Sequence, residues 1–523
     1  MQKKGRYSHL AMIYAYQVHS LFGDHMVLQR RTRIPIWGTA PANSIITVKL
    51  NRKSYGTIAQ GNGHWVAILD EMEAGGPYEV DISCGNSTQT FYDVYVGEVW
   101  ICSGQSNMDQ RVAKGSLHWC GVRNEEEEIE RAQYPLIRLY STRICLSETA
   151  CSEPATAMTE LTNPYTPGYS GSWAVCSPST VGSFSATAYF FGRELFRSNK
   201  VPIGLIVSCY GSSTAEAWIS REALENTPQL VCFLDNYHRR CFEYDSGIAK
   251  TSYKNALQAW FKVAGGSEGH TEAISKGLLP RPMPPHNPRL DQHSPTLLYN
   301  GMIAPLVPYA TRGIVWYHGD SNGITADKYY MLLKALIEDW RSRWARDLTM
   351  LIVQCANIRE LDPSPIGKGS FPVLREAQLS ASRLPNVGLA VTIDIGERDS
   401  HPRNKQEVGR RLSLLARNLV HGECVPCQGP TYDGMKIEGS KIRLCFRHAD
   451  GLTSTGPLGA FAIAGIDGNF VRAQATIDRE TVVVYSGAIL DPVSVRYAWS
   501  NHPIATLVNK HGLPASPFRT DHE

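Results

Sequence analysis

The chain has 523 residues, of which 43% are hydrophobic and 19% charged, and its formal net charge is +3 at pH 7. This composition is typical of a folded globular protein, and at about 150 residues per domain the length predicts two to four domains. Such a small net charge gives no electrostatic basis for binding nucleic acid or an anionic membrane surface.

The cysteines and the N-terminus carry few further signals. The 13 cysteines are an odd number spread along the chain, so at least one has no intrachain partner. Cys424 and Cys427 form an isolated C-x-x-C pair, which disfavours a zinc or redox centre. No apolar run approaches the roughly 18 residues of a membrane helix. The segment LAMIYAY follows three basic residues but lacks a clear cleavage site, so the sequence is compatible with export without establishing it.

Residues 18–95 are predicted to form a small β-sandwich-like domain. Apolar and polar residues alternate there in short runs, which is the pattern of half-buried strands. Clusters of glycine, proline and asparagine separate the runs and indicate turns. The runs read RIPIWG, SIITVKL, HWVAILD and PYEVDIS.

Residues 96–424 change to alternating strands and helices. Because the strands are continuously apolar, this alternation predicts a parallel sheet covered by helices on both faces, an α/β fold. Irregular insertions are expected at 110–180 and 220–296, the second ending in a proline-rich stretch. The predicted strands are 98–102, 203–209, 313–317, 349–356 and 387–396, and the predicted helices are 183–197, with Ser183 or Ser185 as its N-cap, 327–344 and 373–382.

Residues 425–523 return to short strands, such as KIRLCF and TVVVY, and predict a second β module. The whole chain is therefore expected to place a parallel α/β domain between two β modules.

Polar residues follow four of the predicted core strands. Ligands of such sheets bind beyond the carboxyl ends of the strands, so these residues are the candidates for a site. Together they supply a serine, glycine loops and a histidine with nearby carboxylates, the inventory needed for acyl transfer. Taken one at a time, each is also an ordinary turn, loop or buried polar residue. The four groups are Gly104-Gln105-Ser106-Asn107; Gly211-Ser212-Ser213 with Glu216 and Trp218; His318-Gly319-Asp320-Ser321-Asn322; and Asp394 with Asp399 and His401.

Several long motifs resemble the sialate O-acetylesterase family, a branch of the SGNH (GDSL-like) hydrolases. They occur in order from about residue 20 to the end of the chain: LFGDHMVLQR, EVWICSGQSNM, IGLIVSCYGSSTAEAWIS, LYNGMIAPL, VWYHGDSN, HPRNKQEVGRRL and RYAWSN. The resemblance implies an SGNH-hydrolase-like three-layer α/β/α fold, flanked by the two β modules, and an esterase activity that needs no metal or other cofactor.

Carried over by motif, the resemblance makes Ser106 the nucleophile and His401 the general base. Gly211 would contribute its backbone N–H to the oxyanion hole beside the N–H of Ser106. The remaining residues expected at the oxyanion or the substrate are Gln105, Asn107, His318, Asp320, Asn322, Trp218 and Asn300.

The sequence departs from the family pattern in three places. His318 and Asp320 stand where the third motif usually carries glutamine and glutamate. Ser212 replaces the second of two paired glycines. SGNH hydrolases commonly place aspartate three residues before the histidine, where this chain has Arg398. Asp399, two residues before His401, is the candidate orienting acid; a backbone carbonyl and Asp394 are the alternatives.

Two kinds of function fit this pattern. The first is an esterase that removes acetyl groups from sugar hydroxyls, on sialic acid or on another glycan such as xylan. The second is a non-catalytic glycan-binding protein on the same scaffold, which the retention of both Ser106 and His401 argues against. An α/β-hydrolase with a G-x-S-x-G elbow fits poorly because position 108 is methionine. The expected partner is an O-acetylated carbohydrate, with no nucleic acid; the oligomeric state is left open.

Overall fold

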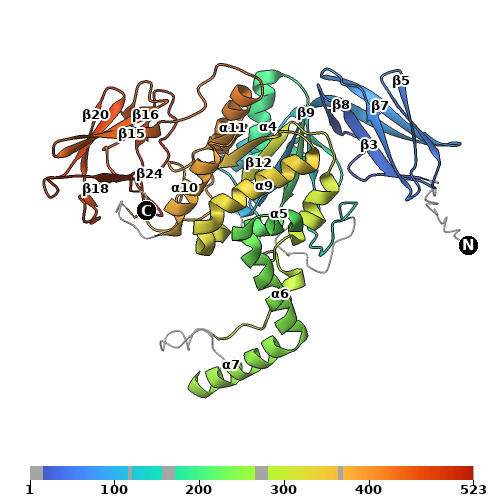
Figure 1. Cartoon of the computed structure of the whole chain (residues 1–523). Coiled ribbons are helices and arrows are strands. Elements are labelled where there is room, and N and C mark those ends of the chain that lie inside the picture. Colours follow the sequence, from blue (N-terminus) through green and yellow to red (C-terminus); the bar gives the residue numbers. More distant parts are fainter. Residues whose placement is uncertain (1–15, 116–119, 156–170, 265–280, 363–368, 522–523) are drawn as a thin grey trace, which may run out of the picture.

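The computed structural model describes residues 16–115, 120–155, 171–264, 281–362 and 369–521 (Figure 1). An α/β body with a central sheet lies between two groups of β-strands, one from each end of the chain. Among the described residues, no helix has the length and apolar character to cross a bilayer.

The central sheet is mixed, and its middle strands are parallel. Their order is β10-β9-β11-β8-β12-β13-β14, and the five pairings from β9 to β14 are all parallel. The carboxyl ends of β8, β11 and β12 therefore meet at one edge of the sheet. The bounds are β8 Ser87–Gly104, β9 Tyr134–Ser141, β10 Ala174–Cys176, β11 Ile203–Cys209, β12 Gly313–Tyr317, β13 Thr349–Val353 and β14 Val387–Ala390.

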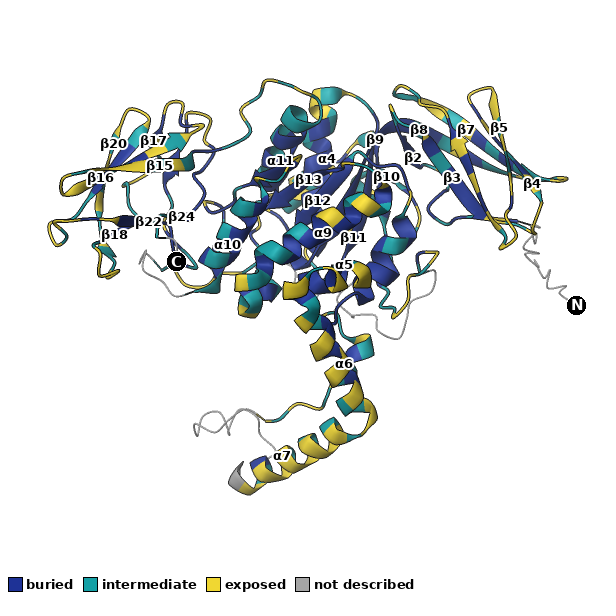
Figure 2. Cartoon of the chain, in the orientation of Figure 1, coloured by how far each residue is buried: buried dark blue, intermediate teal, exposed yellow. Residues whose placement is uncertain are grey.

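Helices pack on both faces of these strands. Trp100 and Cys102 of β8 are buried with α4 (Ala186–Asn199) and α11 (Lys405–Leu419). Ile101, pointing the other way, shares a core with α9 (Tyr329–Trp344) and α10 (Ser370–Ala381). Burying such a side chain contributes about 1.5–3 kcal/mol, and Figure 2 shows the central strands almost wholly buried.

Helix α4 begins where the sequence predicts. Of the two serines proposed as its cap, Ser185 is the N-cap, and its hydroxyl accepts a hydrogen bond from the N–H of Ala188 at 3.2 Å. The same hydroxyl donates to the carbonyl of Met108 at 2.6 Å. Cap and tertiary contact thus anchor α4 beside the segment that follows β8.

Four of the N-terminal strands, β2, β4, β5 and β7, are joined to the central sheet through β8, whereas β1, β3 and β6 form a separate three-stranded sheet. Strand β8 has 18 residues and runs through the predicted domain boundary between residues 95 and 96. In β6 every second residue is buried, as the alternation predicts. The bounds are β1 Gln17–Val18, β2 Val27–Gln29, β3 Ile34–Thr39, β4 Ile45–Leu50, β5 Lys53–Ile58, β6 His64–Leu69 and β7 Gly75–Cys84.

The C-terminal strands form two four-stranded sheets and a two-stranded one around their own hydrophobic core. Their bounds are β15 Thr431–Glu438, β16 Lys441–Arg447, β17 Thr453–Ser454, β18 Phe461–Ala464, β19 Val471–Arg472, β20 Gln474–Asp478, β21 Thr481–Tyr485, β22 Ser494–Tyr497, β23 Leu507–Val508 and β24 Phe518–Arg519.

The two insertions expected to be irregular contain regular structure. The first contributes β9 to the central sheet, and the arginine in its sequence conceals this: Arg138 is buried because it pairs with Asp93 and lies over the Tyr95 ring. The second contains α5, α6 and α7, of which α7 projects from the body and is largely exposed (Figures 1 and 2). Their bounds are α5 Arg221–Glu225, α6 Val231–Asp245 and α7 Ile248–Ala264.

Short helices complete the described elements. They are α1 Ser106–Asp109, α2 Glu125–Glu130, α3 Pro178–Val181, the 3-10 helices η1 Ala215–Trp218, η2 Pro228–Leu230, η3 Pro288–Leu290, η5 Ala304–Leu306 and η6 Asp320–Lys328, and the π-helix η4 Tyr299–Ile303.

Gly104, at the end of β8, has no room for a side chain. Its φ is +138°, and a Cβ there would lie 2.2 Å from the carbonyl oxygen of Tyr317 on β12. We expect Gly104→Ala to destabilise the protein by at least about 2 kcal/mol, because strain and steric overlap add. The measurement is the urea unfolding midpoint. Gly61→Ala, where nothing lies within 4 Å of the added Cβ, is the control; equal midpoints for the two variants would contradict the argument.

Candidate active site

Ser106 lies at the sharp exit from β8 into α1. The backbone N–H of Gln105 donates to the carbonyl of Tyr317 at 3.1 Å, which ties the turn to β12. Ser106 is the first residue of α1 and is only 8% exposed. The first N–H groups of a helix have no acceptor within the helix, so this position offers a donor next to the serine hydroxyl.

The glycine loop after β11 lies against Ser106. A Cβ placed on Gly211 would be 3.7 Å from the Cβ of Ser106, so the two residues lie next to each other. The next residue, Ser212, has a φ of +59°, in the left-handed region. A glycine adopts that conformation without strain, which explains why the family pattern has a second glycine here.

Asn107 connects the serine turn to the histidine loop. Its Nδ2 donates to the carbonyl of Ser400 at 2.8 Å. Its Oδ1 accepts from the ammonium group of Lys405 at 2.7 Å, and that ammonium also donates to Pro402 at 2.9 Å. Because Ser400 and Pro402 flank His401, these bonds bring the histidine loop to the nucleophile turn.

Lys405 is completely buried at the start of α11. Burial lowers the pKa of its ammonium group to about 7, because the charged form loses its hydration. The ring of Tyr317 lies 5.2 Å from Nζ and faces the charge. Sequence reasoning missed Lys405; the available signal was its place within the HPRNK motif.

Asp399 is placed on His401. One carboxylate oxygen lies 2.8 Å from His401 Nδ1 and accepts a second hydrogen bond, also 2.8 Å, from the backbone N–H of His401. Asp394 is engaged elsewhere, in two hydrogen bonds of 2.6 Å with Arg411. Of the two carboxylates considered in the sequence, Asp399 is therefore the one in position to orient the imidazole.

The environment of His401 favours its neutral form. Burial is the largest cause of its lowered pKa, and the positive charge of Lys405 adds to it, while Asp399 acts in the opposite direction. A neutral imidazole at physiological pH is the form that accepts a proton as a base.

The HGDSN motif, which follows β12, is hydrogen-bonded to Gln105 of the serine turn. Gln105 Oε1 accepts from the backbone N–H groups of Gly319 and Ser321, both at 3.4 Å. An oxygen anchored in this way directs the NH2 group of Gln105 to the other side. Asp320 is half-buried, and burial raises the pKa of its carboxyl group.

Both ring nitrogens of His318 are bound within the protein. Nε2 lies 2.9 Å from the carbonyl of Ser213 and must donate to it, so Nδ1 accepts from the hydroxyl of Tyr329, also at 2.9 Å. Burial lowers the pKa of His318 to about 3 and keeps it neutral. A direct contact with substrate would have to break one of these bonds, and the assignment of His318 to the substrate site stays a prediction.

Asn322 is similarly engaged. Its Oδ1 accepts from the N–H of Ala215 at 2.8 Å, and its Nδ2 donates to Glu216 at 2.9 Å and Thr325 at 3.1 Å. These bonds hold the glycine loop after β11 to the motif after β12. The expected contact of Asn322 with the oxyanion or the substrate stays a prediction.

Trp218 differs from its expected role as a sugar-stacking side chain. It has no exposed surface, its indole N–H donates to Ser213 Oγ at 2.9 Å, and it packs edge-on against Trp316. Stacking needs an exposed ring face, so in this structure Trp218 is a core residue. Asn300 is also buried, and its Nδ2 donates to the carbonyl of Ser147 at 3.0 Å; its expected role stays a prediction.

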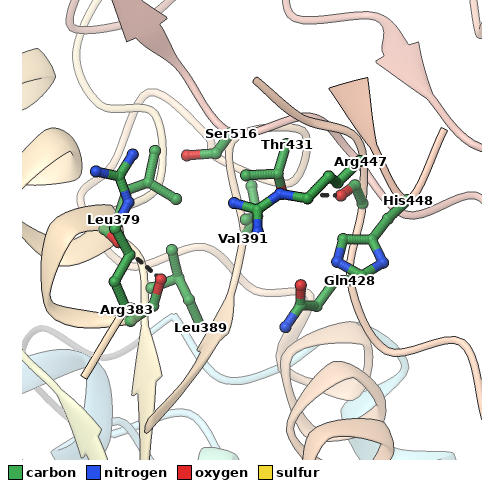
Figure 3. A pocket seen from close by; sticks show the side chains of 11 residues that line it. Leu379, Arg383, Leu389, Val391, Gln428, Thr431, Arg447, His448 and Ser516 are labelled. Atoms are coloured by element: carbon green, nitrogen blue, oxygen red, sulfur yellow. Dashed lines mark hydrogen bonds between the residues drawn. The ribbon is translucent and has the colours of Figure 1, made fainter. Parts of the chain in front are cut away.

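A separate cavity of about 270 Å³ lies between α10, β14 and the C-terminal strands (Figure 3). Arg383 and Arg447 line it together with His448 and polar side chains. None of the residues that the sequence places in the site lines this cavity. It is therefore distinct from the cluster around Ser106.

The comparisons with known proteins point in one direction. No protein-family model matches the chain. Sialate O-acetylesterase of Rattus norvegicus is 27% identical over 553 residues, covering 96% of this chain and 94% of that protein. The Homo sapiens sialate O-acetylesterase is 28% identical over 440 residues, covering 78% and 72%.

A solved structure of a carbohydrate acetylesterase from Xanthomonas citri matches with a TM-score of 0.77 and 31% identity, covering 97% of this chain and 100% of that one. The chain belongs to the sialate O-acetylesterase family. Membership of this family agrees with the motifs read from the sequence. Four of them meet in the structure at the Ser106 turn: the serine motif itself, the glycine loop after β11, the HGDSN motif after β12 and the HPRNK motif.

The ionisation of His401 tests the electrostatics of this site. We expect its imidazole to titrate below the ordinary value of 6.5, where Lys405 is still protonated and repels the imidazolium. In Lys405→Met the midpoint moves upward, because a positive neighbour has been removed. The measurement is NMR titration of the histidine ring signal that is lost in His401→Gln. The control is Lys334→Met, which removes a partly exposed lysine on α9; an unchanged midpoint in Lys405→Met would contradict the assignment.

Proposed function

We propose that this member of the sialate O-acetylesterase family is a serine esterase that hydrolyses O-acetyl esters of carbohydrates. The observation that carries the proposal is the link made by Asn107, which joins the serine turn to the histidine loop through Ser400 and Lys405. This link supports the proposal because it brings the turn of Ser106, the proposed nucleophile, to the loop of His401 and Asp399, the proposed base and its carboxylate partner. A protein that only binds glycans does not require such a cluster.

The proposed reaction has two steps. His401 takes the proton of the Ser106 hydroxyl as its oxygen attacks the acetyl carbonyl, and then gives that proton to the departing sugar oxygen. Water, deprotonated by His401, next attacks the acetyl carbon of the acetyl-enzyme. The bond to Ser106 Oγ then breaks, His401 returns the proton to that oxygen, and the acetyl group leaves as acetic acid, which ionises to acetate. Asp399 holds the Nδ1–H of His401 throughout and stabilises the imidazolium that forms in each step.

The negative oxygen that develops on the carbonyl needs donors fixed in advance. The proposal assigns this role to the N–H groups of Ser106 and Gly211, two residues that lie next to each other. The NH2 group of Gln105 supplies a third donor, since its Oε1 is anchored and His318 is engaged elsewhere. Each donor of this kind contributes about 3–4 kcal/mol to the transition state.

The finer architecture is part of the same proposal. We propose that helices on both faces of the central strands form the three-layer α/β/α arrangement of SGNH hydrolases. Residues 18–95 and 425–523 would be β modules attached to the catalytic part, residues 96–424. The unbroken course of β8 through the first boundary supports a rigid attachment.

The named relatives favour sialic acid as the sugar, and acetylated xylan is the alternative that the experiment separates. We expect acetate release from 4-nitrophenyl acetate and from O-acetylated sialic acid, falling by at least about 10⁴-fold in Ser106→Ala. Covalent labelling of Ser106 by an organophosphonate reports the nucleophile independently. Release from the simple ester alone would point to acetylated xylan, and neither release nor labelling would leave the glycan-binding alternative.

Asp399 is expected to matter less than His401. Asp399 orients and stabilises the imidazole, whereas His401 moves the proton itself, so Asp399→Ala should lose less activity than His401→Ala. In a related kind of triad, removing the aspartate costs roughly 10⁴-fold and removing the histidine roughly 10⁶-fold. The kcat of both variants on 4-nitrophenyl acetate checks this, and equal losses would show that proton transfer fails completely without Asp399.

A further inference from the structure

A second aspartate-histidine pair lies near the candidate active site, in the loop before η4. The carboxylate of Asp291 accepts from the backbone N–H of His293 at 3.0 Å, and its same oxygen lies 2.7 Å from Nδ1. Asp399 and His401 have this same geometry and the same two-residue spacing. The proposed reaction makes no use of the second pair.

His293 is linked to the glycine loop that lies next to Ser106. Its carbonyl accepts from the hydroxyl of Thr214 at 3.3 Å. Thr214 lies three positions after Gly211, the residue next to Ser106. The Cα atoms of Gly211 and Thr214 are therefore at most about 11 Å apart. The phenol of Tyr210 lies near both Asp109 and Asp291, whose charges add to burial in raising its pKa. Asp109 belongs to α1, so the second pair and the nucleophile helix share one neighbourhood.

Asp291 is the shared partner of two basic side chains. One of its carboxylate oxygens binds His293 and the other binds Arg240 of α6. The side chain of Asp291 is 14% exposed, whereas that of His293 is 45% exposed, so the imidazole ring is the more accessible partner. Glu216, a nearby carboxylate, is buried and receives the amide of Asn322.

The surroundings of the two histidines shift their pKa values in opposite directions. The hydrogen bond to Asp291 is the main cause that raises the pKa of His293, with Glu216 adding to it, while burial and Arg240 oppose it. The pKa of His401 is lowered. Environments that separate two similar groups in this way commonly separate their roles.

We infer that His293, held by Asp291 and Arg240, is a specificity-determining residue that receives the carboxylate of an acidic O-acetylated sugar while Ser106 attacks the ester. The inference rests on the proposed function and narrows its substrate class to acidic sugars such as sialic acids. A neutral acetylated xylan has no group for this donor. Within the described residues, Nε2 of His293 has no protein acceptor and is available for such a carboxylate.

The test compares a free acid with its neutral ester. KM for O-acetylated sialic acid and for its methyl ester is measured in wild type, in His293→Gln and in the control His238→Gln, which alters a histidine on α6 that contacts Arg221. We expect the preference for the acid to fall about tenfold in His293→Gln, the size of a charged hydrogen bond. His238→Gln should keep the wild-type preference. An unchanged preference in His293→Gln would overturn the inference.

Direct binding separates this inference from the proposed function. Calorimetry measures the affinity of Ser106→Ala protein for unacetylated sialic acid and for its methyl ester, with and without His293→Gln. Tighter binding of the acid that depends on His293 supports the inference even if no acetate is released from any ester. Equal binding of acid and ester, together with Ser106-dependent acetate release, would overturn the inference and leave the esterase proposal standing.

Discussion

The candidate site depends on the hydrogen bonds of one amide side chain. Asn107 and Ser400 are 293 positions apart in sequence, yet the amide of one donates to the carbonyl of the other. Lys405 closes the arrangement by binding both the Asn107 side chain and the carbonyl of Pro402. These bonds join the serine turn to the histidine loop, although each lies on a different strand connection of the sheet.

The hydrogen bond that the Asn107 amide oxygen accepts from Lys405 places a charged side chain in the protein interior. The ammonium group of Lys405 is buried, and its lowered pKa is the consequence of lost hydration. The same charge lowers the pKa of His401. Lys405 therefore both positions the histidine loop and favours the neutral form of the His401 imidazole. These two effects give a physical reason for Lys405 in the HPRNK motif, which sequence analysis singled out only for His401.

The departures from the family pattern have local structural consequences. Both ring nitrogens of His318 are hydrogen-bonded, one to the carbonyl of Ser213 and one to the hydroxyl of Tyr329. His318 therefore joins the motif after β12 to the glycine loop after β11. Ser212 adopts the left-handed conformation that a glycine would take with less strain. Gln105 remains anchored by the motif after β12. The hydrogen bonds that hold the site together are therefore formed although His318 and Ser212 differ from the family pattern.

Much of this protein followed from sequence pattern alone. The alternation of residues in β6, the N-cap of α4 at Ser185 and the family resemblance all depend on neighbours in sequence, where periodicity and short motifs carry the information. Tertiary structure decided the rest. β9 was not predicted from the sequence because Arg138 interrupts its apolar residues with a charge. In the folded protein that charge is paired with Asp93 and lies over the ring of Tyr95. The burial of Trp218, the choice of Asp399 over Asp394, and the approach of Lys405 and His293 to the site each depend on contacts between distant segments, and no local pattern encodes a distance between them.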